Sequence, residues 1–181
     1  RDDAAGEAFD KAARAMGMPY PGGVELDKIA ESGNDKAYRL PRPSVDGAPF
    51  DFSFSGLKTN VINLLHNAEQ RGETVSVPDL AASYRRAVVD CLVRNALLAA
   101  EQTGAQKLVT AGGVSANSLL RRELRARCAE RGLSFYCPRL SLCGDNGAMV
   151  AAQGYYEFAA GNIAGPDLNA CAELPVEFSP V

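Results

Sequence analysis

Hydrophobic residues recur along the chain at spacings typical of helices in some stretches and of strands in others. Apolar residues at helical spacing predict an amphipathic helix over residues 3–17, and a turn, MPYPGG, separates it from a second short helix over 24–31. Longer helices are predicted over 58–70 and 78–103, the latter with Pro78 in its first turn. These helices alternate with short apolar runs that have the pattern of strands.

Three of those runs predict strands. Between Phe50 and Ser55 phenylalanines alternate with polar residues, which indicates a half-buried strand. The apolar, β-branched run 108–111 predicts a strand of a covered sheet, and the run 133–137 predicts another. Residues 33–49 contain three prolines and predict a loop, with a short extended piece at 38–40. The alternation of helices and strands favours an α/β fold.

The stretch Lys107 to Asn117, KLVTAGGVSAN, predicts a strand, a Gly-Gly turn and the start of a helix. Ser115 or Asn117 is expected to cap that helix, which runs to about Arg131 and ends at Gly132. The free N–H groups at such a helix start are suited to holding a nucleotide. The pattern alone is equally consistent with a tight turn in an α/β domain.

A last helix is predicted after Gly144-Asp145-Asn146-Gly147, through apolar residues as far as Phe158. Asp145 is therefore expected at or near a helix N-terminus, either as its cap or as a carboxylate presented to a site. The tail over 161–181 has little periodicity and is predicted to be irregular.

Charged residues narrow the functional classes. A net charge of −3 argues against a protein that grips nucleic acid unaided. The helix after Asn117 is nevertheless basic and could meet RNA phosphates. Because no aromatic residues interleave with its arginines, a solvated face is favoured. Solvated faces are also expected for three arginines of the helix over 78–103, namely Arg85, Arg86 and Arg94.

Cysteine and histidine usage indicates the compartment and limits metal chemistry. The five cysteines include no CxxC pair and are odd in number, so a reducing, cytoplasmic location is expected and a disulfide framework is not. His66 is the only histidine, so we expect a structural or surface role for it. No apolar run reaches the roughly 18 residues that a membrane helix needs, and no membrane partner is expected.

Four separated motifs then occur in order: DDAAGEAFDKAAR with YPGG, DFSFSGLKT, TAGGVSANS and CGDNGAMVA. From Asp2 to about Gly161 the chain resembles the tRNA N6-adenosine threonylcarbamoyltransferase family, formerly called O-sialoglycoprotein endopeptidase. The resemblance implies a helix-rich, actin/Hsp70/sugar-kinase-like (ribonuclease H-like) α/β fold. Residues 1–181 would form the C-terminal half of a two-domain protein.

The resemblance also implies an acyltransferase reaction. The threonylcarbamoyl group of threonylcarbamoyl-adenylate would pass to N6 of adenosine 37 in tRNAs that read codons starting with A. The implied partners are the adenylate, the tRNA, a paralogous inactive subunit and a small P-loop ATPase. The older protease name has no support, because the chain contains no HExxH.

Residue by residue, the resemblance implies a substrate site and one metal ligand. Asp10 matches the residue that binds the ribose of the adenylate, and Gly23 matches a close main-chain contact to the same ligand. Asp27 matches an acidic ligand contact of some members, and Asn117 matches the contact to the nucleoside. Asp145 matches the carboxylate that binds the divalent metal ion of the family, iron or zinc.

Two family features are absent from this chain. It lacks the HxxxH motif, which supplies two metal-binding histidines, and the SGGHT-like strand that contacts the phosphate region of the ligand. Gly144 also stands where many members have Thr. Because the chain begins with Arg1 and carries one metal ligand of three, we expect a fragment that lacks the N-terminal domain and is inactive alone.

Two other functional classes stay open. An actin-like-fold kinase or ATPase also places a Gly-Gly turn after a strand, although it is not expected to combine DFSFSGLKT with GDNGAMVA. A non-catalytic scaffold subunit of a tRNA-modifying complex is the other alternative, and the retained Asp10, Gly23, Asn117 and Asp145 argue against it.

Overall fold

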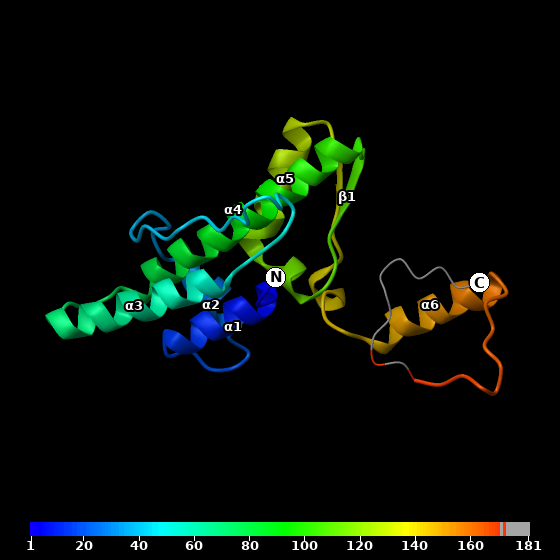
Figure 1. Cartoon of the computed structure of the whole chain (residues 1–181), viewed down its shortest axis with the longest axis horizontal. Helices are drawn as coiled ribbons and strands as arrows, with labels where there is room; N and C mark the ends of the chain where they lie inside the picture. The colour runs from blue at the N-terminus through cyan, green and yellow to red at the C-terminus, as the bar shows by residue number, and fades with distance from the viewer. Residues whose placement is uncertain (171, 173–181) are drawn as a thin grey trace. The chain divides into compact units, whose positions relative to one another are not determined.

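The computed structural model describes residues 1–170 and 172 and divides the chain into two compact units, 1–143 and a second that begins at Gly144 (Figure 1). The elements of the first unit, in chain order, are α1 (Ala5–Ala15), α2 (Gly22–Ala30), α3 (Ser55–Arg71), α4 (Val77–Thr103), β1 (Lys107–Val109), the 3₁₀ helix η1 (Gly113–Ala116), α5 (Ser118–Glu130), β2 (Ser134–Tyr136) and the 3₁₀ helix η2 (Leu140–Leu142). The second unit contains α6 (Gly147–Ala159).

Four helices form the larger hydrophobic core. The apolar faces of α1, α2 and α3 and the N-terminal half of α4 bury side chains that include Phe9, Leu26, Leu57 and Tyr84. The rings of Phe9 and Tyr84 meet edge to face, with centroids 5.9 Å apart. The Tyr84 hydroxyl donates to the Ala8 carbonyl oxygen at 2.9 Å, which ties α4 to α1. The predicted amphipathic helices are therefore confirmed, with ends shifted by a few residues.

The C-terminal half of α4 packs with α5 and a small sheet around a second cluster of apolar side chains. Among the described residues the sheet has two strands, β1 and β2, which pair in parallel with Leu108 opposite Phe135. Helix α5 connects the two strands, which is the arrangement that parallel pairing requires. Asn117 rather than Ser115 is the N-cap of α5, and Gly132 follows its end with a φ of 69°.

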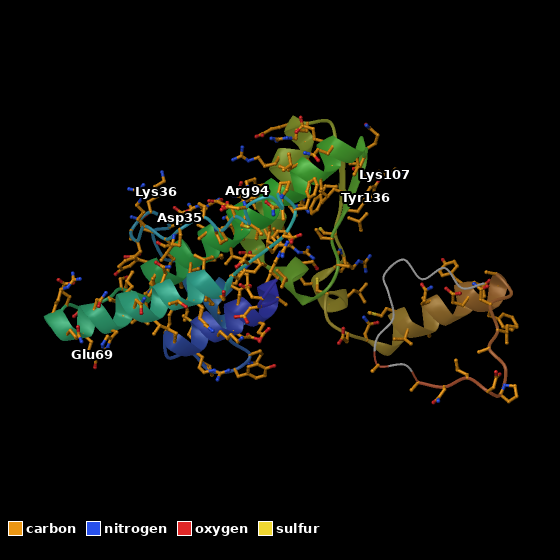
Figure 2. The ribbon with its side chains drawn as sticks, viewed as in Figure 1. Asp35, Lys36, Glu69, Arg94, Lys107 and Tyr136 are labelled. Carbon is orange, nitrogen blue, oxygen red and sulfur yellow. The ribbon has the colours of Figure 1, made fainter. Side chains whose placement is uncertain are left out.

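The expectation of a covered sheet is wrong for the described part of the chain. Leu108 and Phe135 pack against the core, whereas Val109 and Tyr136 are 70% and 53% exposed. Lys107 and Tyr136 extend from the two strands in Figure 2. Side chains of a strand alternate between two faces, and here the helices cover only one of them.

The predicted strand over Phe50 to Ser55 is also wrong, because residues 50–54 contain neither helix nor strand and Ser55 already belongs to α3. Residues 38–40 likewise contain neither helix nor strand, within the loop predicted over 33–49. The alternation is real, since the rings of Phe52 and Phe54 stack with centroids 5.9 Å apart. The backbone N–H of Phe54, however, donates to the Asp2 carboxylate at 2.8 Å instead of to a neighbouring strand. Helix α3 consequently begins at Ser55, three residues earlier than predicted.

The second unit contains the last predicted helix, α6. Its N-cap is Asn146, whose side-chain oxygen accepts from the Met149 N–H at 3.0 Å. Asp145 therefore lies one residue before the cap and is exposed. Residues 161–170 contain neither helix nor strand, and the remainder of the predicted tail lies outside the described residues except for Ala172. In the described part of the chain, none of the helices combines the length and apolar character that crossing a bilayer requires.

Candidate functional site

A cavity of about 570 Å³ in the first unit brings together four of the five predicted site residues. Asp10 contributes from α1, Gly23 and Asp27 from α2, and Asn117 from the start of α5. The rest of the lining is largely apolar and consists of Gly6, Phe9, Pro21, Val24, Gly113, Val114, Ala116 and Leu140. A mainly apolar pocket with a few convergent polar groups is typical of a small-molecule site.

Asp10 and Gly23 are fixed to each other where α1 meets the N-terminus of α2. The Gly23 N–H donates to Asp10 Oδ1 at 2.8 Å, so the carboxylate accepts from a free N–H of the first turn of α2. The helices approach closely here, because a Cβ on Gly22 would lie 2.4 Å from the Cβ of Ala13. Within the described residues Asp10 Oδ2 accepts no hydrogen bond, so this oxygen is left for a ligand.

Asp27 joins α2 to the first residue of α5. Its Oδ1 accepts from Arg85 Nη1 at 2.9 Å and from Ser118 Oγ at 3.0 Å, and its Oδ2 accepts from the Ser118 N–H at 2.9 Å. Because a carboxylate has about four acceptor positions, roughly one remains on Oδ2 for a ligand. The interactions of Asp27 therefore fix its position beside the cavity.

The interpretation of Arg85 as a solvated residue is wrong, because its side chain is only 6% exposed. It lies on the packed face of α4, three or four residues from Ala81, Ala82, Val88 and Val89, which are all buried. Arg86 is half-buried between Asp35 and Glu123, so it too departs from that interpretation. Arg94, by contrast, is exposed, and Figure 2 shows it on α4.

Asn117 is buried, caps α5 and lines the cavity. Its Oδ1 accepts from the Leu120 N–H at 3.0 Å, which is the N-cap interaction. Its amide nitrogen makes no hydrogen bond within the described residues and can donate to a ligand. The preceding turn needs glycine at Gly112, whose φ is 81°.

Arg121 is a third arginine that departs from the predicted solvated face, because it is half-buried. Its Nε donates to the Ser115 carbonyl oxygen at 2.6 Å, and its guanidinium also donates to the Pro138 carbonyl oxygen. These contacts hold η1 beside the segment that follows β2, and both segments contribute to the cavity lining. Other arginines of α5 do form a surface face, as Arg127 does with Glu123 and Glu130.

Three ionisable groups of the first unit that do not line the cavity have displaced pKa values. The hydrogen bond from Arg85, aided by one from Ser118, lowers the pKa of Glu31. Burial raises the pKa of the Tyr84 phenol well above its usual range. Hydrogen bonds from Ser53 and Ser55 hold the pKa of Asp2 well below that of an ordinary carboxyl group.

Asp145 belongs to the second unit, where it is exposed. Within the described residues, no three His, Cys, Asp or Glu side chains gather so that they could hold a metal ion. The described residues thus do not fit a complete metal centre, and the assignment of Asp145 as a metal ligand stays a prediction. His66 is exposed on α3, 3.0 Å from the Gln70 side chain, which agrees with the surface position included in the prediction of a structural or surface role.

Sequence reasoning missed the apolar lining of the cavity and the role of Arg85. Val24 and Leu140 of the lining are 71% and 65% exposed. Their signal in the sequence was a large apolar side chain beside a turn. For Arg85 the signal was its position within the apolar stripe of α4, at helical spacing from buried alanines and valines.

Comparison with known proteins identifies the family. A family model described as "TsaD: tRNA N6-adenosine threonylcarbamoyltransferase" matches residues 1–152. Curated proteins with that name include that of Moorella thermoacetica, which is 50% identical over 176 residues, or 97% of this chain and 52% of the relative. The protein of Desulfitobacterium hafniense is 51% identical over 174 residues, or 96% of this chain and 51% of the relative. The protein of Listeria innocua is 49% identical over 179 residues, 98% of this chain and 52% of its own. The chain spans about half the length of these relatives.

Solved structures of HypF are similar in fold. Full-length HypF aligns over 91% of this chain and 21% of its own with a TM-score of 0.59 at 19% identity. HypF of T. kodakarensis aligns over 88% and 20% with a TM-score of 0.57 at 22% identity. At these identities the likeness concerns the fold alone, a helix-rich α/β arrangement with a small parallel sheet. By its sequence match, the chain belongs to the tRNA N6-adenosine threonylcarbamoyltransferase family.

Proposed function

We propose that this chain is the adenylate-binding half of an enzyme that transfers a threonylcarbamoyl group from threonylcarbamoyl-adenylate to N6 of adenosine 37 in tRNA. The observation that carries the proposal is the gathering of Asp10, Gly23, Asp27 and Asn117, from α1, α2 and the start of α5, around one cavity. Family membership supplies the reaction, and the cavity supplies a place for its nucleotide.

In this reaction the N6 amine attacks the carbonyl carbon of the threonylcarbamoyl group. A bond from nitrogen to carbon forms, the bond from that carbon to the phosphate oxygen breaks, the amine loses a proton, and AMP leaves. The residues around the cavity hold the AMP portion, so their contribution is to bind and orient the donor.

The chemistry of each side chain fits a nucleoside. Asp10 Oδ2 accepts from a ribose hydroxyl, and Gly23 lets the ligand approach the main chain because it has no Cβ. The Asn117 amide donates to the nucleoside, and Asp27 offers its remaining acceptor position on Oδ2. The apolar side chains of Phe9 and Val114 exclude water from this part of the cavity.

The metal ion, the partners and the larger fold are further parts of the proposal. A divalent ion, iron or zinc, would polarise the transferred group when bound, and Asp145 is its proposed ligand in this chain. The tRNA, a paralogous inactive subunit and a small P-loop ATPase are the proposed partners in the cytoplasm.

The α/β architecture would be one half of an actin-like pair of domains, and we propose that the 181-residue chain alone is inactive.

The test is a reconstituted modification assay with the full-length protein, its partners, threonylcarbamoyl-adenylate and unmodified tRNA, scored by mass spectrometry of tRNA nucleosides. Asp10→Asn and Asn117→Ala should each reduce the rate by about tenfold or more, as expected when a hydrogen bond to the donor is lost. Asp46→Asn, in an exposed loop, is the matched control and should leave the rate unchanged.

Two outcomes contradict the proposal. Wild-type protein that leaves the tRNA unmodified while it phosphorylates sugars or acetate would support the kinase alternative. Full modification by both the Asp10 and the Asn117 variants would show that the cavity does not hold the donor.

A further inference from the structure

We propose that Arg85 is a positioning residue that fixes Asp27 and the first turn of α5 beside the adenylate. The proposal rests on the function proposed above, since it concerns how the same cavity is held in shape. Arg85 itself does not line the cavity, so it acts through residues that do.

The Arg85 guanidinium connects α4 to two other helices. On α2, Nη1 shares its two N–H groups among three acceptors: the Asp27 carbonyl oxygen and Asp27 Oδ1, both at 2.9 Å, and Glu31 Oε1 at 2.6 Å. Nη2 donates to the Ala30 carbonyl oxygen at 3.2 Å. On α5, the Ser118 hydroxyl lies 3.1 Å from Nη1. The buried guanidinium of Arg85 thereby joins α2 to α5.

A chain of contacts then leads from Arg85 to the cavity. Arg85 holds Asp27 Oδ1, and Asp27 Oδ2 accepts from the N–H of Ser118. Ser118 directly follows Asn117 in sequence, and both Asp27 and Asn117 line the cavity. A shift of the guanidinium would therefore move two predicted ligand contacts together.

The burial of Arg85 suggests that the cluster of Arg85, Asp27, Glu31 and Ser118 is not optimised for stability alone. Its Nε is buried and has no hydrogen-bond partner among the residues that the structure describes. A buried cation costs desolvation free energy that an apolar side chain would avoid, and an unpaired donor adds to that cost. What the guanidinium provides instead is a planar set of donors that orients two carboxylates at once.

Arg86 provides a matched control in the neighbouring position. It also connects α4 to α5, through Glu123 at 2.8 Å, and it contacts Asp35 at 2.8 Å. Neither partner lines the cavity. A variant of Arg86 thus removes a comparable arginine from the same helix without disturbing Asp27 or Ser118.

The experiment titrates AMP into the full-length protein by calorimetry and records the melting temperature of each variant. Arg85→Met should raise the Kd for AMP by about tenfold, the size of a coupling within one hydrogen-bond network. Arg85→Lys keeps the charge but not the planar donors and should give an intermediate Kd. Arg86→Met should lower the melting temperature and leave the Kd unchanged.

A double-mutant cycle separates positioning from general stability. If Arg85 acts through Asp27, combining Arg85→Met with Asp27→Asn should raise the Kd by less than the product of the two single effects. In the modification assay Arg85→Met should raise KM for threonylcarbamoyl-adenylate more than it lowers kcat. Should Arg85→Met fail to fold, Ser118→Ala, which removes the hydroxyl shared by Arg85, Asp27 and Glu31, should raise the Kd by a smaller factor.

The inference is overturned if Arg85→Met, or Ser118→Ala in its place, binds AMP as the wild type does. It is also overturned if Arg86→Met weakens binding equally. Wild-type protein that shows no binding of AMP is a different failure, because it removes the proposed function itself.

Discussion

The α1–α2 wall of the candidate cavity packs through backbone and small side chains, whereas the η1–α5 wall is held by polar side chains. On the first wall Ala12 and Ala13 are fully buried, and Gly22 leaves no room for a Cβ. On the second wall the N-cap of Asn117 and the contacts of Asp27 and Arg121 determine where the backbone lies.

This difference implies that the two walls are sensitive to different kinds of substitution. The first wall depends on close contact, so added volume should be the most damaging change. The second wall depends on hydrogen bonds, so removal of one polar group should be damaging even when volume is conserved. Both walls contribute predicted ligand contacts, and Asp27 of α2 joins them by accepting from Ser118 of α5. Added volume therefore tests the first wall, and removal of a polar group tests the second.

The largest effect is expected from Gly22→Ala. A Cβ at this position would lie 2.4 Å from the Cβ of Ala13, so α1 and α2 must separate. We expect a loss of about 1–3 kcal/mol in unfolding free energy, the usual cost of overpacking, measured by urea denaturation. Gly23→Ala is the control, because its Cβ would meet Phe9 and Asp10 at ordinary contact distances of 3.5 and 3.6 Å. Equal losses in the two variants would contradict the close packing of this wall.

A smaller effect is expected on the second wall from Asn117→Ala. Loss of the N-cap should reduce the unfolding free energy by about 1 kcal/mol. Asn117→Asp keeps an acceptor for the Leu120 N–H and should retain stability, while the lost donor should weaken AMP binding by about tenfold. Thermal unfolding and calorimetry of both variants check this, and an Asp variant with wild-type affinity would remove Asn117 from the ligand contacts.

The smallest effect is expected from loss of the hydrogen bond that joins Tyr84 of α4 to Ala8 of α1. Tyr84→Phe removes the hydrogen bond to the Ala8 carbonyl oxygen and should cost about 0.5–1.5 kcal/mol at neutral pH.

The pH dependence of that variant has a definite sign. Because burial raises the pKa of Tyr84 in the folded protein, its contribution is fully present below the unfolded value of about 10 and is lost as the pH rises above it. The stability difference between wild type and Tyr84→Phe should therefore shrink above about pH 10 in denaturation curves. A difference that grows instead would mean that Tyr84 ionises readily in the folded state.

The helices were largely predictable from the sequence because they rest on local signals, whereas the candidate site residues came from the family resemblance. Helical periodicity located α1 to α6, and Asn117 and Gly132 marked the ends of α5. Asp10, Gly23, Asp27 and Asn117 were selected by resemblance, and the structure places them around one cavity. Whether they bind the adenylate stays a prediction.

The errors share a physical cause, because each depends on a contact between residues distant in sequence. The strand predicted at Phe50 to Ser55 is absent because Asp2 accepts from the N–H groups of Phe54 and Ser55. Arg85 is buried because α2 and α5 bring carboxylates to it. Local patterns record the propensity of a segment and not its tertiary partners.

The most direct test of the central claim is a crystal structure of the full-length protein with AMP. The account predicts AMP in the cavity of about 570 Å³, with its ribose at Asp10 and its nucleoside within hydrogen-bonding distance of Asn117. AMP bound elsewhere, for example in the cavity of about 730 Å³ beside Tyr38, Asn63 and Val75, would contradict it.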